Sequence, residues 1–338
     1  MGKILVTGVA GFIGFHVSKS LLDKGIDVWG IDNLNSYYDV SLKVSRLDYL
    51  KHLSNSSPGK FCFEKIDISD KFLLDNYFNK NTFDSVIHLA AQAGVRHSID
   101  CPEDYVASNL LGFFNILENS RVSGIKHLVY ASTSSVYGAN EVIPFAEKSV
   151  SDKPLQFYAA TKRANELMAH SYSALHNLPT SGLRFFTVYG PYGRPDMALF
   201  KFTKNILENK PIDIFNNGDH ARDFTYIDDI VEGILKVHSN PPKKQKSSNG
   251  MDTYDPPFRV LNIGNGCPVN LESFIDEIEN NLKTKAIRNY IEFQIGDIHT
   301  TYADTTELQN LTGFKPSTNI KDGIRNFIDW YRDYYHIK

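Results

Sequence analysis

Two side chains that can move protons stand one helical turn apart near the middle of the sequence. Tyr158 and Lys162 bracket the segment Tyr-Ala-Ala-Thr-Lys, so on a helix they share one face. A free tyrosine has a pKa of about 10, and a phenolate that acts near neutral pH needs a positive charge beside it. We expect Lys162 to supply that charge. The pair predicts acid–base chemistry, although the same spacing occurs by chance on many helices.

A cluster of hydroxyl residues lies about 25 positions upstream. Residues 131–138 read Ala-Ser-Thr-Ser-Ser-Val-Tyr-Gly and follow a predicted strand over 127–132. Ligands of open α/β sheets gather at the carboxyl ends of the strands, where this cluster falls. A hydroxyl there, with Thr133 as the candidate, can hydrogen-bond a reacting oxygen and relay its proton to Tyr158.

The amino-terminal segment carries a glycine pattern that binds phosphates. Residues 8–14 read Gly-Val-Ala-Gly-Phe-Ile-Gly, directly after a predicted strand and at the start of a predicted helix. In this context Gly8 permits a tight turn, Gly11 lets backbone N–H groups approach a pyrophosphate, and Gly14 lets the helix pack on the sheet. The segment predicts a dinucleotide site at Gly8, Gly11, Phe12, Ile13 and Gly14.

The ends of the next strands complete that site. Asp32 ends the second predicted strand, where a carboxylate accepts the adenosine ribose hydroxyls and repels a 2′-phosphate. Because no Arg or Lys occurs in residues 33–35, the sequence favours NAD over NADP. Further cofactor contacts are expected at Asn33, Asp67, Ile68, Leu89, Ala90, Ala91 and Gln92.

Alternating short β-rich runs and helical stretches place these residues in an α/β fold. Strands are predicted over residues 3–7, 27–32, 61–66, 85–89, 127–132 and 182–188, with long helices over 103–121 and 157–176. Parallel strands need right-handed crossovers, so helices should cover both faces. The pattern predicts a Rossmann-type doubly wound parallel sheet.

The remaining chain predicts a second, smaller α/β domain for the substrate. Residues 1–188 form the expected NAD-binding domain with the Tyr/Lys helix, and residues 189–338 form mainly the substrate domain, with the chain crossing between the two. Helices over 197–208 and 226–238 and short strands over 213–215 and 260–263 are expected there. Residues 241–257, rich in Pro, Lys, Ser and Asn, predict an exposed loop.

Composition excludes several other classes of protein. The 338 residues carry a net charge of −3, which gives no general field for nucleic acid, and no apolar window is long enough to span a membrane. Three cysteines without CxxC spacing and eleven scattered histidines predict no disulfide framework and no metal site. We expect a cytoplasmic enzyme.

These motifs together resemble the extended short-chain dehydrogenase/reductase family over nearly the whole chain. Within it the sequence is similar to the UDP-glucuronate 4-epimerases, most specifically in residues 187–198, with support from residues 32–39 and 92–96. The resemblance implies reversible conversion of UDP-glucuronate to UDP-galacturonate with retained NAD, in a homodimer joined by long helices. The polysaccharide biosynthesis that uses such sugars follows as the implied role.

The resemblance also assigns roles to individual residues. Tyr158 takes the C4 hydroxyl proton with help from Thr133, Lys162 holds the nicotinamide ribose, Ser134 contacts the sugar and Phe185 contacts the cofactor. A 4-keto uronate is a β-keto acid that can lose carbon dioxide, so its carboxylate must be held. The expected substrate contacts are Arg194 as the carboxylate clamp, Arg96 and Thr187 as helpers, Arg222 at the diphosphate and Phe215 at uracil.

Three alternatives remain open from the sequence. A 4-epimerase of UDP-glucose or of a UDP-N-acetylhexosamine shares every cofactor residue and the Tyr/Lys pair. A nucleotide-sugar dehydratase or decarboxylase is disfavoured, because Ser135 stands where those relatives carry an acidic residue. A non-catalytic NAD-binding protein is disfavoured because the tyrosine, lysine and threonine are all kept.

Overall fold

Seven parallel strands form the central sheet of the computed structural model, which describes residues 2–140, 142–246, 254–292 and 298–337. The strands lie in the order β12-β6-β5-β4-β1-β2-β3. Their bounds are β1 Ile4–Thr7, β2 Val28–Asp32, β3 Phe61–Lys65, β4 Ser85–His88, β5 Leu128–Thr133, β6 Thr180–Phe185 and β12 Phe258–Ile263. This order confirms the predicted doubly wound sheet, with its switch point between β1 and β4.

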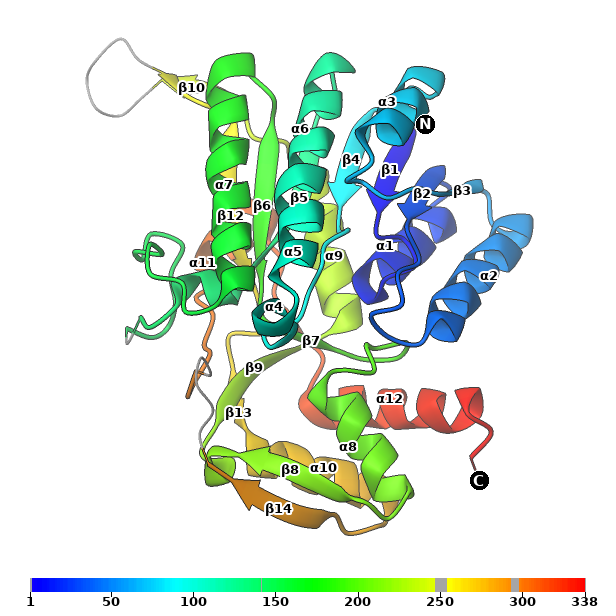
Figure 1. Ribbon diagram of the computed structural model, residues 1–338, viewed down its shortest axis with the longest axis vertical. Coiled ribbons are helices and arrows are strands. Elements are labelled where there is room, and N and C mark those ends of the chain that lie inside the picture. Colours follow the sequence, from blue (N-terminus) through cyan, green and yellow to red (C-terminus); the bar gives the residue numbers. More distant parts are fainter. Residues whose placement is uncertain (1, 141, 247–253, 293–297, 338) are drawn as a thin grey trace.

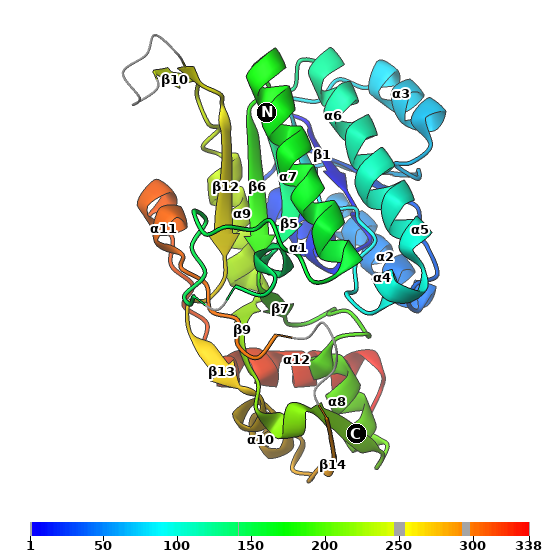
Figure 2. The ribbon, with the colours of Figure 1, turned by 60° about the vertical axis from the view of Figure 1, so that its left-hand side comes forward.

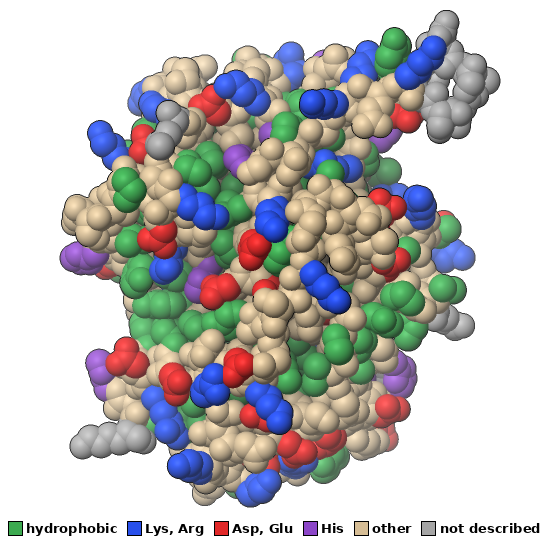
Figure 3. Space-filling view, turned by 180° about the vertical axis from the view of Figure 1, so that it is seen from behind, with side chains coloured by type: hydrophobic (Ala, Val, Ile, Leu, Met, Phe, Trp, Pro, Cys, Tyr) green, Lys and Arg blue, Asp and Glu red, His purple; other side chains and the backbone are tan. Residues whose placement is uncertain are grey.

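Helices cover both faces of this sheet (Figures 1 and 2). One face carries α3 (Lys71–Lys80), α6 (Phe113–Val122) and α7 (Phe157–His176). The other carries α1 (Phe12–Asp23), α2 (Val40–Ser56) and α9 (Ile227–His238), which pack side by side. Because both faces are covered, β1 and β4 are buried throughout, as parallel sheets require. Seen from behind, acidic and basic side chains are interspersed over the surface (Figure 3).

The predicted strand over residues 182–188 is two strands in different sheets. β6 ends at Phe185, and β7 (Thr187–Tyr189) pairs with β9 (Ala221–Tyr226) outside the central sheet. Between them the Phe186 amide donates to the Ile263 carbonyl at 3.2 Å, the last bond to β12. A β-rich run does not indicate where a chain changes sheets, so the sequence analysis predicted one strand instead of two.

The predicted helix over residues 103–121 is helical in three consecutive parts. These are α5 (Pro102–Tyr105), a π-helical stretch η1 (Val106–Gly112) and α6. The short α4 (His97–Asp100) precedes them. The wider turn places Asn109 where its side chain accepts from the Gln92 amide at 2.9 Å and donates to the Thr161 hydroxyl at 3.1 Å. Such π segments often occur beside functional sites.

The smaller lower part of the molecule is built around two short sheets (Figure 1). β9 pairs with β7 and with β13 (Pro268–Asn270), while β8 (Pro211–Phe215) pairs with β14 (Ile287–Ile291). The helices here are α8 (Ala198–Leu207), α10 (Leu271–Leu282) and α12 (Ile320–Tyr334), and α11 (Thr306–Thr312) packs against β12 and α9. One continuous apolar core joins this part to the α1 and α9 face of the central sheet.

The expected loop over residues 241–257 contains a small antiparallel ladder. β10 (Gln245–Lys246) pairs with β11 (Tyr254–Asp255), and both strands are exposed. Residues 247–253 of the predicted loop lie outside the described residues. Within the described ranges, no helix is long and apolar enough to cross a membrane.

Candidate active site

The carboxyl ends of the central strands open onto one cavity that collects most of the predicted site. The end of β5 and the segments that follow β1, β2, β3 and β4 line it, together with the start of α7 and the segment after β7. Of the predicted residues, the cavity is lined by Gly8, Gly11, Phe12, Ile13, Gly14, Asp32, Asn33, Ile68, Leu89, Ala90, Ala91, Gln92, Thr133, Tyr158, Lys162, Phe185 and Arg194. Residues up to 186 positions apart in the sequence thus face one space.

The glycine segment forms a cradle whose close backbone packing leaves no space for a side chain at Gly8 or Gly14. Gly8 has a φ of +70°, and a Cβ there would lie 2.7 Å from the Ala90 amide nitrogen. A Cβ on Gly14 would lie 2.1 Å from the Gly8 carbonyl oxygen. Helix α1 begins directly after Gly11, so its first N–H groups point to the cavity. These features fit a dinucleotide pyrophosphate.

Asp32 is buried at the end of β2 and is held by two backbone amides. Its carboxylate accepts from the amides of Ala10 at 3.1 Å and Leu34 at 2.8 Å. Burial raises the pKa of this carboxyl, while the hydrogen bonds and the charge of Lys43 oppose that rise. The fixed carboxylate suits the ribose hydroxyls for which it was predicted. Neighbouring Asn33 donates to the Asp67 carboxylate at 2.8 Å.

Tyr158 and Thr133 both line the cavity. The Thr133 hydroxyl lowers the pKa of the phenol, and Lys162, one turn along α7, donates to the Ala131 carbonyl at 3.0 Å. Helix α7 spans residues 157–176 as predicted and ends where Asn177 takes a left-handed φ of 57°. The structure therefore brings the phenol, the ammonium and the hydroxyl to the same edge of β5.

The charges around Tyr158 differ from the sequence prediction in one respect. Burial raises the pKa of the phenol, and the opposing positive charge comes from Arg194 rather than from Lys162. Burial lowers the pKa of Lys162 to about 8. In this structure the lysine points its ammonium to the Ala131 carbonyl, so its effect on the phenol is smaller than the helical spacing suggested.

Arg194 borders the cavity but already binds a carboxylate of the protein. Its Nε lies 3.0 Å from Oδ1 of Asp196 and its Nη2 lies 2.5 Å from Oδ2, a bidentate pair. The Tyr37 hydroxyl donates to the same Asp196 oxygen at 3.2 Å. Burial lowers the pKa of Arg194, but Asp196 outweighs it and leaves that pKa raised. Among the described residues, no acceptor binds Nη1.

Six predicted site residues lie outside the lining of this cavity. Thr187 borders a smaller neighbouring cavity that Arg194 also lines. The guanidinium of Arg96 lies over the Phe215 ring, 4.1 Å from its centre. Arg222 donates to the carbonyl of His299 at 2.9 Å. Ser134 begins a short 3₁₀ turn, η2 (Ser134–Tyr137), and Asp67 accepts from Ser69.

Several residues that the sequence reading passed over do line the cavity. The polar ones are Asn35, Tyr37, Tyr38, Lys43, Ser108 and Ser132. The Lys43 ammonium donates to the Asn35 carbonyl at 2.7 Å, and burial lowers its pKa. Lys43 is eleven residues beyond Asp32, on α2, so a search for basic residues directly after the strand could not find it.

Arg46 is a second missed residue, and it is fully buried. Its guanidinium donates to the Ala10 carbonyl in the glycine segment and to the Tyr192 carbonyl, both at 2.7 Å. It thus ties the glycine segment to the segment that carries Arg194. The sequence of α2 did not indicate that Arg46 would be buried, because a basic residue in a helix usually faces solvent.

One group of possible metal ligands occurs in the described part of the chain. His97, Cys101 and Asp104 offer ligand atoms within 4.8 Å of one another. None of the three lines the cavity described above. His97 pairs with Asp104 at 3.3 Å and stacks near Tyr37. The predicted absence of a metal site stays a prediction.

Comparison with known proteins agrees with the site. Residues 4–264 match the model of the NAD dependent epimerase/dehydratase family. Protein CapI of Staphylococcus aureus is 51% identical over 340 residues, which cover 98% of this chain and 99% of CapI. The probable UDP-glucuronate 4-epimerase of Rhizobium meliloti is 47% identical over 338 residues, covering 98% of both chains.

Solved structures show the same arrangement. The crystal structure of UDP-glucuronic acid 4-epimerase from Bacillus cereus in complex with UDP-glucuronic acid and NAD superposes with a TM-score of 0.86 at 32% identity. The match covers 98% of this chain and 100% of the Bacillus cereus chain. The similarity therefore extends over both the central sheet and the smaller lower part.

Proposed function

Since this chain belongs to the NAD dependent epimerase/dehydratase family, we propose that it interconverts UDP-glucuronate and UDP-galacturonate through a 4-keto intermediate, with NAD retained. One observation carries the proposal. A single cavity brings together the glycine cradle, the Tyr158–Thr133 pair and the guanidinium of Arg194. These are a dinucleotide site, a proton acceptor and a group that recognises a carboxylate.

The glycine cradle and Asp32 would hold NAD. Gly8 and Gly14 let the segment after β1 pack tightly against neighbouring backbone, so that the start of α1 would face the pyrophosphate, and Asp32 would accept the adenosine ribose hydroxyls. Lys162 would hold the nicotinamide ribose. The chemistry that bound NAD would supply is reversible hydride transfer at C4 of the sugar, and these residues would hold it for that purpose.

Tyr158 acts on the proton that leaves the C4 hydroxyl. Its phenol oxygen takes that proton, and the Thr133 hydroxyl, which lies close enough to lower the pKa of the phenol, would stabilise the oxygen. On the return step the same phenol gives the proton back to the C4 oxygen. The buried phenol has a raised pKa, so the positive charge of Arg194 and the bound cofactor must lower it for this step.

Arg194 is the proposed partner of the substrate carboxylate. Its pair with Asp196 uses Nε and Nη2, and the Nη1 edge faces no protein acceptor among the described residues. A carboxylate bound at that edge is held fixed. The bond to carbon dioxide then cannot align with the ketone of the intermediate, and decarboxylation is suppressed. The sequence predicted Arg194 as the clamp for the substrate carboxylate but not that Asp196 occupies one edge of its guanidinium.

The nucleotide end of the substrate is proposed to lie toward the lower part of the molecule. Arg96 and Phe215 stack there, so uracil would share the exposed side of that ring or guanidinium. Arg222 on β9 would contact the diphosphate, and Ser134 and Thr187 would contact the sugar. These roles rest on the resemblance and on positions near, but not in, the cavity lining.

The experiment that tests this function compares three substrates. The purified protein is incubated separately with UDP-glucuronate, UDP-glucose and UDP-N-acetylglucosamine, and the products are resolved by proton NMR. We expect UDP-galacturonate from the first and little product from the other two. Turnover of a neutral sugar alone would show that the substrate is wrong while the chemistry is right.

The assembly is proposed to be a homodimer joined by the two long helices. Apolar side chains on these adjacent helices are exposed, namely Val106, Leu111, Phe114 and Val122 on η1 and α6, and Leu167 and Leu175 on α7. A second copy would bury them. Light scattering after gel filtration should give twice the chain mass for the wild type. Leu167→Glu should give a larger share of monomer than Val150→Glu, an exposed control outside these helices.

Two further expectations stay proposals. We propose that residues 1–188 serve mainly the cofactor and residues 189–338 mainly the substrate, although β12 returns to the central sheet. We also propose a cytoplasmic location, which the three free cysteines support. Cell fractionation tests the second.

A further inference from the structure

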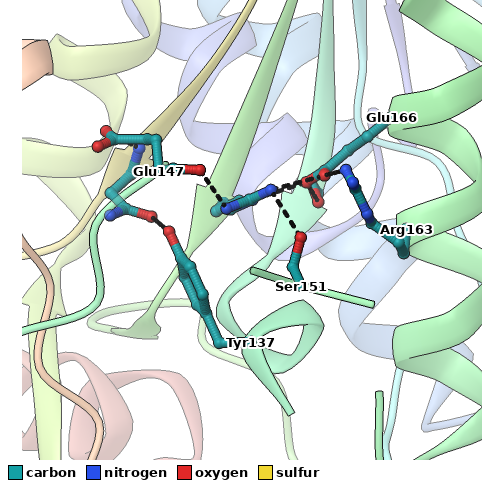
Figure 4. A network of polar contacts seen from close by, with 8 residues as sticks. Tyr137, Glu147, Ser151, Arg163 and Glu166 are labelled. Atoms are coloured by element: carbon teal, nitrogen blue, oxygen red, sulfur yellow. Dashed lines mark hydrogen bonds and ion pairs between the residues drawn. The ribbon is translucent and has the colours of Figure 1, made fainter. Parts of the chain in front are cut away.

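A buried polar network lies behind the proposed catalytic residues and takes no part in the chemistry described above. Figure 4 shows it between α7 and the strands β5 and β6. Its centre is the carboxylate of Glu166, which is fully buried on α7. The network is unusual in placing an acidic and a basic side chain together in the interior, where such residues are rare unless paired.

Glu166 receives hydrogen bonds from both neighbouring strands. The Ser132 hydroxyl of β5 donates to Oε1 at 2.6 Å. Arg184 of β6 binds it in bidentate fashion, with Nε and Nη2 each at 2.8 Å from a carboxylate oxygen. Since Ser132 and Arg184 are partners in the β5–β6 register, the carboxylate bridges one helix and two adjacent strands.

The same three elements carry the proposed catalytic groups. Lys162 precedes Glu166 by one turn on α7 and donates to the carbonyl of Ala131. Thr133, the partner of Tyr158, follows Ser132 directly on β5. Any shift of α7 along the sheet that breaks the Glu166 contacts would therefore also move the Tyr158 phenol relative to the Thr133 hydroxyl.

A second layer of contacts holds Arg184. Figure 4 labels its members Tyr137, Glu147 and Ser151. The Tyr137 ring lies 4.7 Å from its guanidinium carbon, and the Tyr137 hydroxyl donates to Asn262 of β12 at 2.6 Å. Arg184 also donates to the carbonyl of Glu147 at 3.3 Å. The arginine thus has one defined position, and its fork imposes an orientation on Glu166.

We propose that Glu166 and Arg184 are positioning residues for the epimerisation: they lock α7 onto β5 and β6 so that Tyr158 and Thr133 meet the same sugar oxygen. This inference rests on the proposed function. The pair acts by geometry, because Glu166 is not among the charges that act on Tyr158 or Lys162. Apolar packing alone would let α7 shift along the sheet, whereas the bidentate ion pair forms only when α7 lies at one position relative to β6.

The chain offers a matched control for this idea. Arg163 Nη1 donates to the same Glu166 carboxylate at 2.8 Å, but Arg163 is itself on α7, three residues earlier. Its contact cannot fasten the helix to the sheet. If fastening is what matters, losing Arg163 should leave the reaction rate nearly unchanged, while losing the contacts to Ser132 or Arg184 should lower it.

The test compares Glu166→Gln, Ser132→Ala and Arg163→Gln with the wild type, using UDP-glucuronate and its C4-deuterated form. For Glu166→Gln we expect kcat to fall by about 10- to 100-fold with KM within about twofold, since small misplacements cost about that much. We also expect a larger deuterium isotope effect, because hydride transfer becomes rate-limiting. Ser132→Ala should show a smaller loss of the same kind, and Arg163→Gln should match the wild type.

Each other outcome has a clear meaning. Retained cofactor content and a cooperative thermal melt show that a variant is folded, and Ser132→Ala serves if Glu166→Gln is not. A folded Glu166→Gln protein with wild-type kcat and isotope effect overturns the proposal, and so does an equal loss in Arg163→Gln. If the wild type does not epimerise UDP-glucuronate at all, the proposed function fails instead.

Discussion

Two bidentate arginine–carboxylate pairs of this protein differ in what surrounds them. Arg184 and Glu166 are joined by two 2.8 Å contacts, and their side chains are 3% and 0% exposed. Arg194 and Asp196 have the same bidentate form, but their side chains are 22% and 24% exposed and border the cavity. The same chemical pair is thus enclosed by strands in one region and open to a ligand in the other.

This difference shows that the degree of burial decides whether an arginine–carboxylate pair stabilises the fold or can also bind a ligand. Every acceptor site on Glu166 faces a donor from the protein, so the inner pair has no contact left for a ligand and serves the fold. Arg194 keeps an edge of its guanidinium without a protein partner in the described chain, so the outer pair can bind an anion. Removing one member of a buried pair leaves an uncompensated charge, whereas a partly exposed pair contributes much less to stability.

The largest expected effect removes the phenol and leaves both pairs intact. Tyr158→Phe should lower kcat for UDP-glucuronate by about 10²- to 10⁴-fold, the usual contribution of a positioned acid–base group. Cofactor content and thermal stability should stay near those of the wild type. NMR time courses measure the rate. An unchanged rate would remove the chemistry that both pairs are supposed to serve.

The next largest effect is a difference in the free energy of unfolding between variants of the two arginine–carboxylate pairs. Arg184→Ala should lower the free energy of unfolding by about 3 kcal/mol, because the buried Glu166 charge then keeps only Ser132 and the partly exposed Arg163. Arg194→Ala should lower it by less than about 1 kcal/mol. Urea unfolding followed by circular dichroism measures both. Equal losses would mean that the two environments do not differ as their exposures indicate.

A variant of the outer pair, Arg194–Asp196, should instead be distinguished by its activity on the substrate. Arg194→Ala should lower kcat/KM for UDP-glucuronate by about 30-fold, equivalent to about 2 kcal/mol for a lost charged contact. It should also release a UDP-pentose, because the unclamped keto acid can lose carbon dioxide. Mass spectrometry detects that product. Clean epimerisation at the normal rate would argue against the clamp.

The smallest effect concerns acid stability. Burial raises the pKa of Glu166, but Arg184, Ser132 and Arg163 outweigh it and leave that pKa below its ordinary 4.5. A depressed carboxyl pKa stabilises the fold above the unfolded value, and this contribution is lost as pH falls below about 4.5 toward the folded value. Urea midpoints between pH 6 and 3.5 should therefore fall more steeply for the wild type than for Glu166→Gln. Parallel slopes would contradict this account.

The sequence predicted the parts of the molecule that depend on local pattern. The glycine segment, Asp32 and the Tyr158/Lys162 helix obey fixed spacings, and the strands that carry them have apolar runs of the expected length. Helix α7 is found at the predicted residues. The doubly wound sheet followed from the alternation of these elements.

Contacts that depend on tertiary packing could not be predicted, even between residues close in the sequence. Asp196 pairs with Arg194, only two residues away, yet nothing in the sequence showed that both side chains would turn toward each other beside Tyr37. Lys43 lines the cavity from α2. Arg46 is buried although a basic residue does not fit the apolar pattern by which core positions are predicted. Glu166 and Arg184 are ordinary charged residues until the β5–β6 register brings Ser132 and Arg184 together. Such placements depend on tertiary packing, which no local spacing encodes.

The central claim is that C4 of a UDP-uronate loses a hydride while its hydroxyl oxygen loses a proton, and that both return within one enclosed site. UDP-glucuronate carrying deuterium at C4 tests this most directly, in ordinary water and without added NAD. The account predicts UDP-galacturonate that keeps deuterium at C4 in every molecule, as shown by NMR and mass spectrometry. Product that carries protium at C4 would show exchange with solvent and would contradict the account.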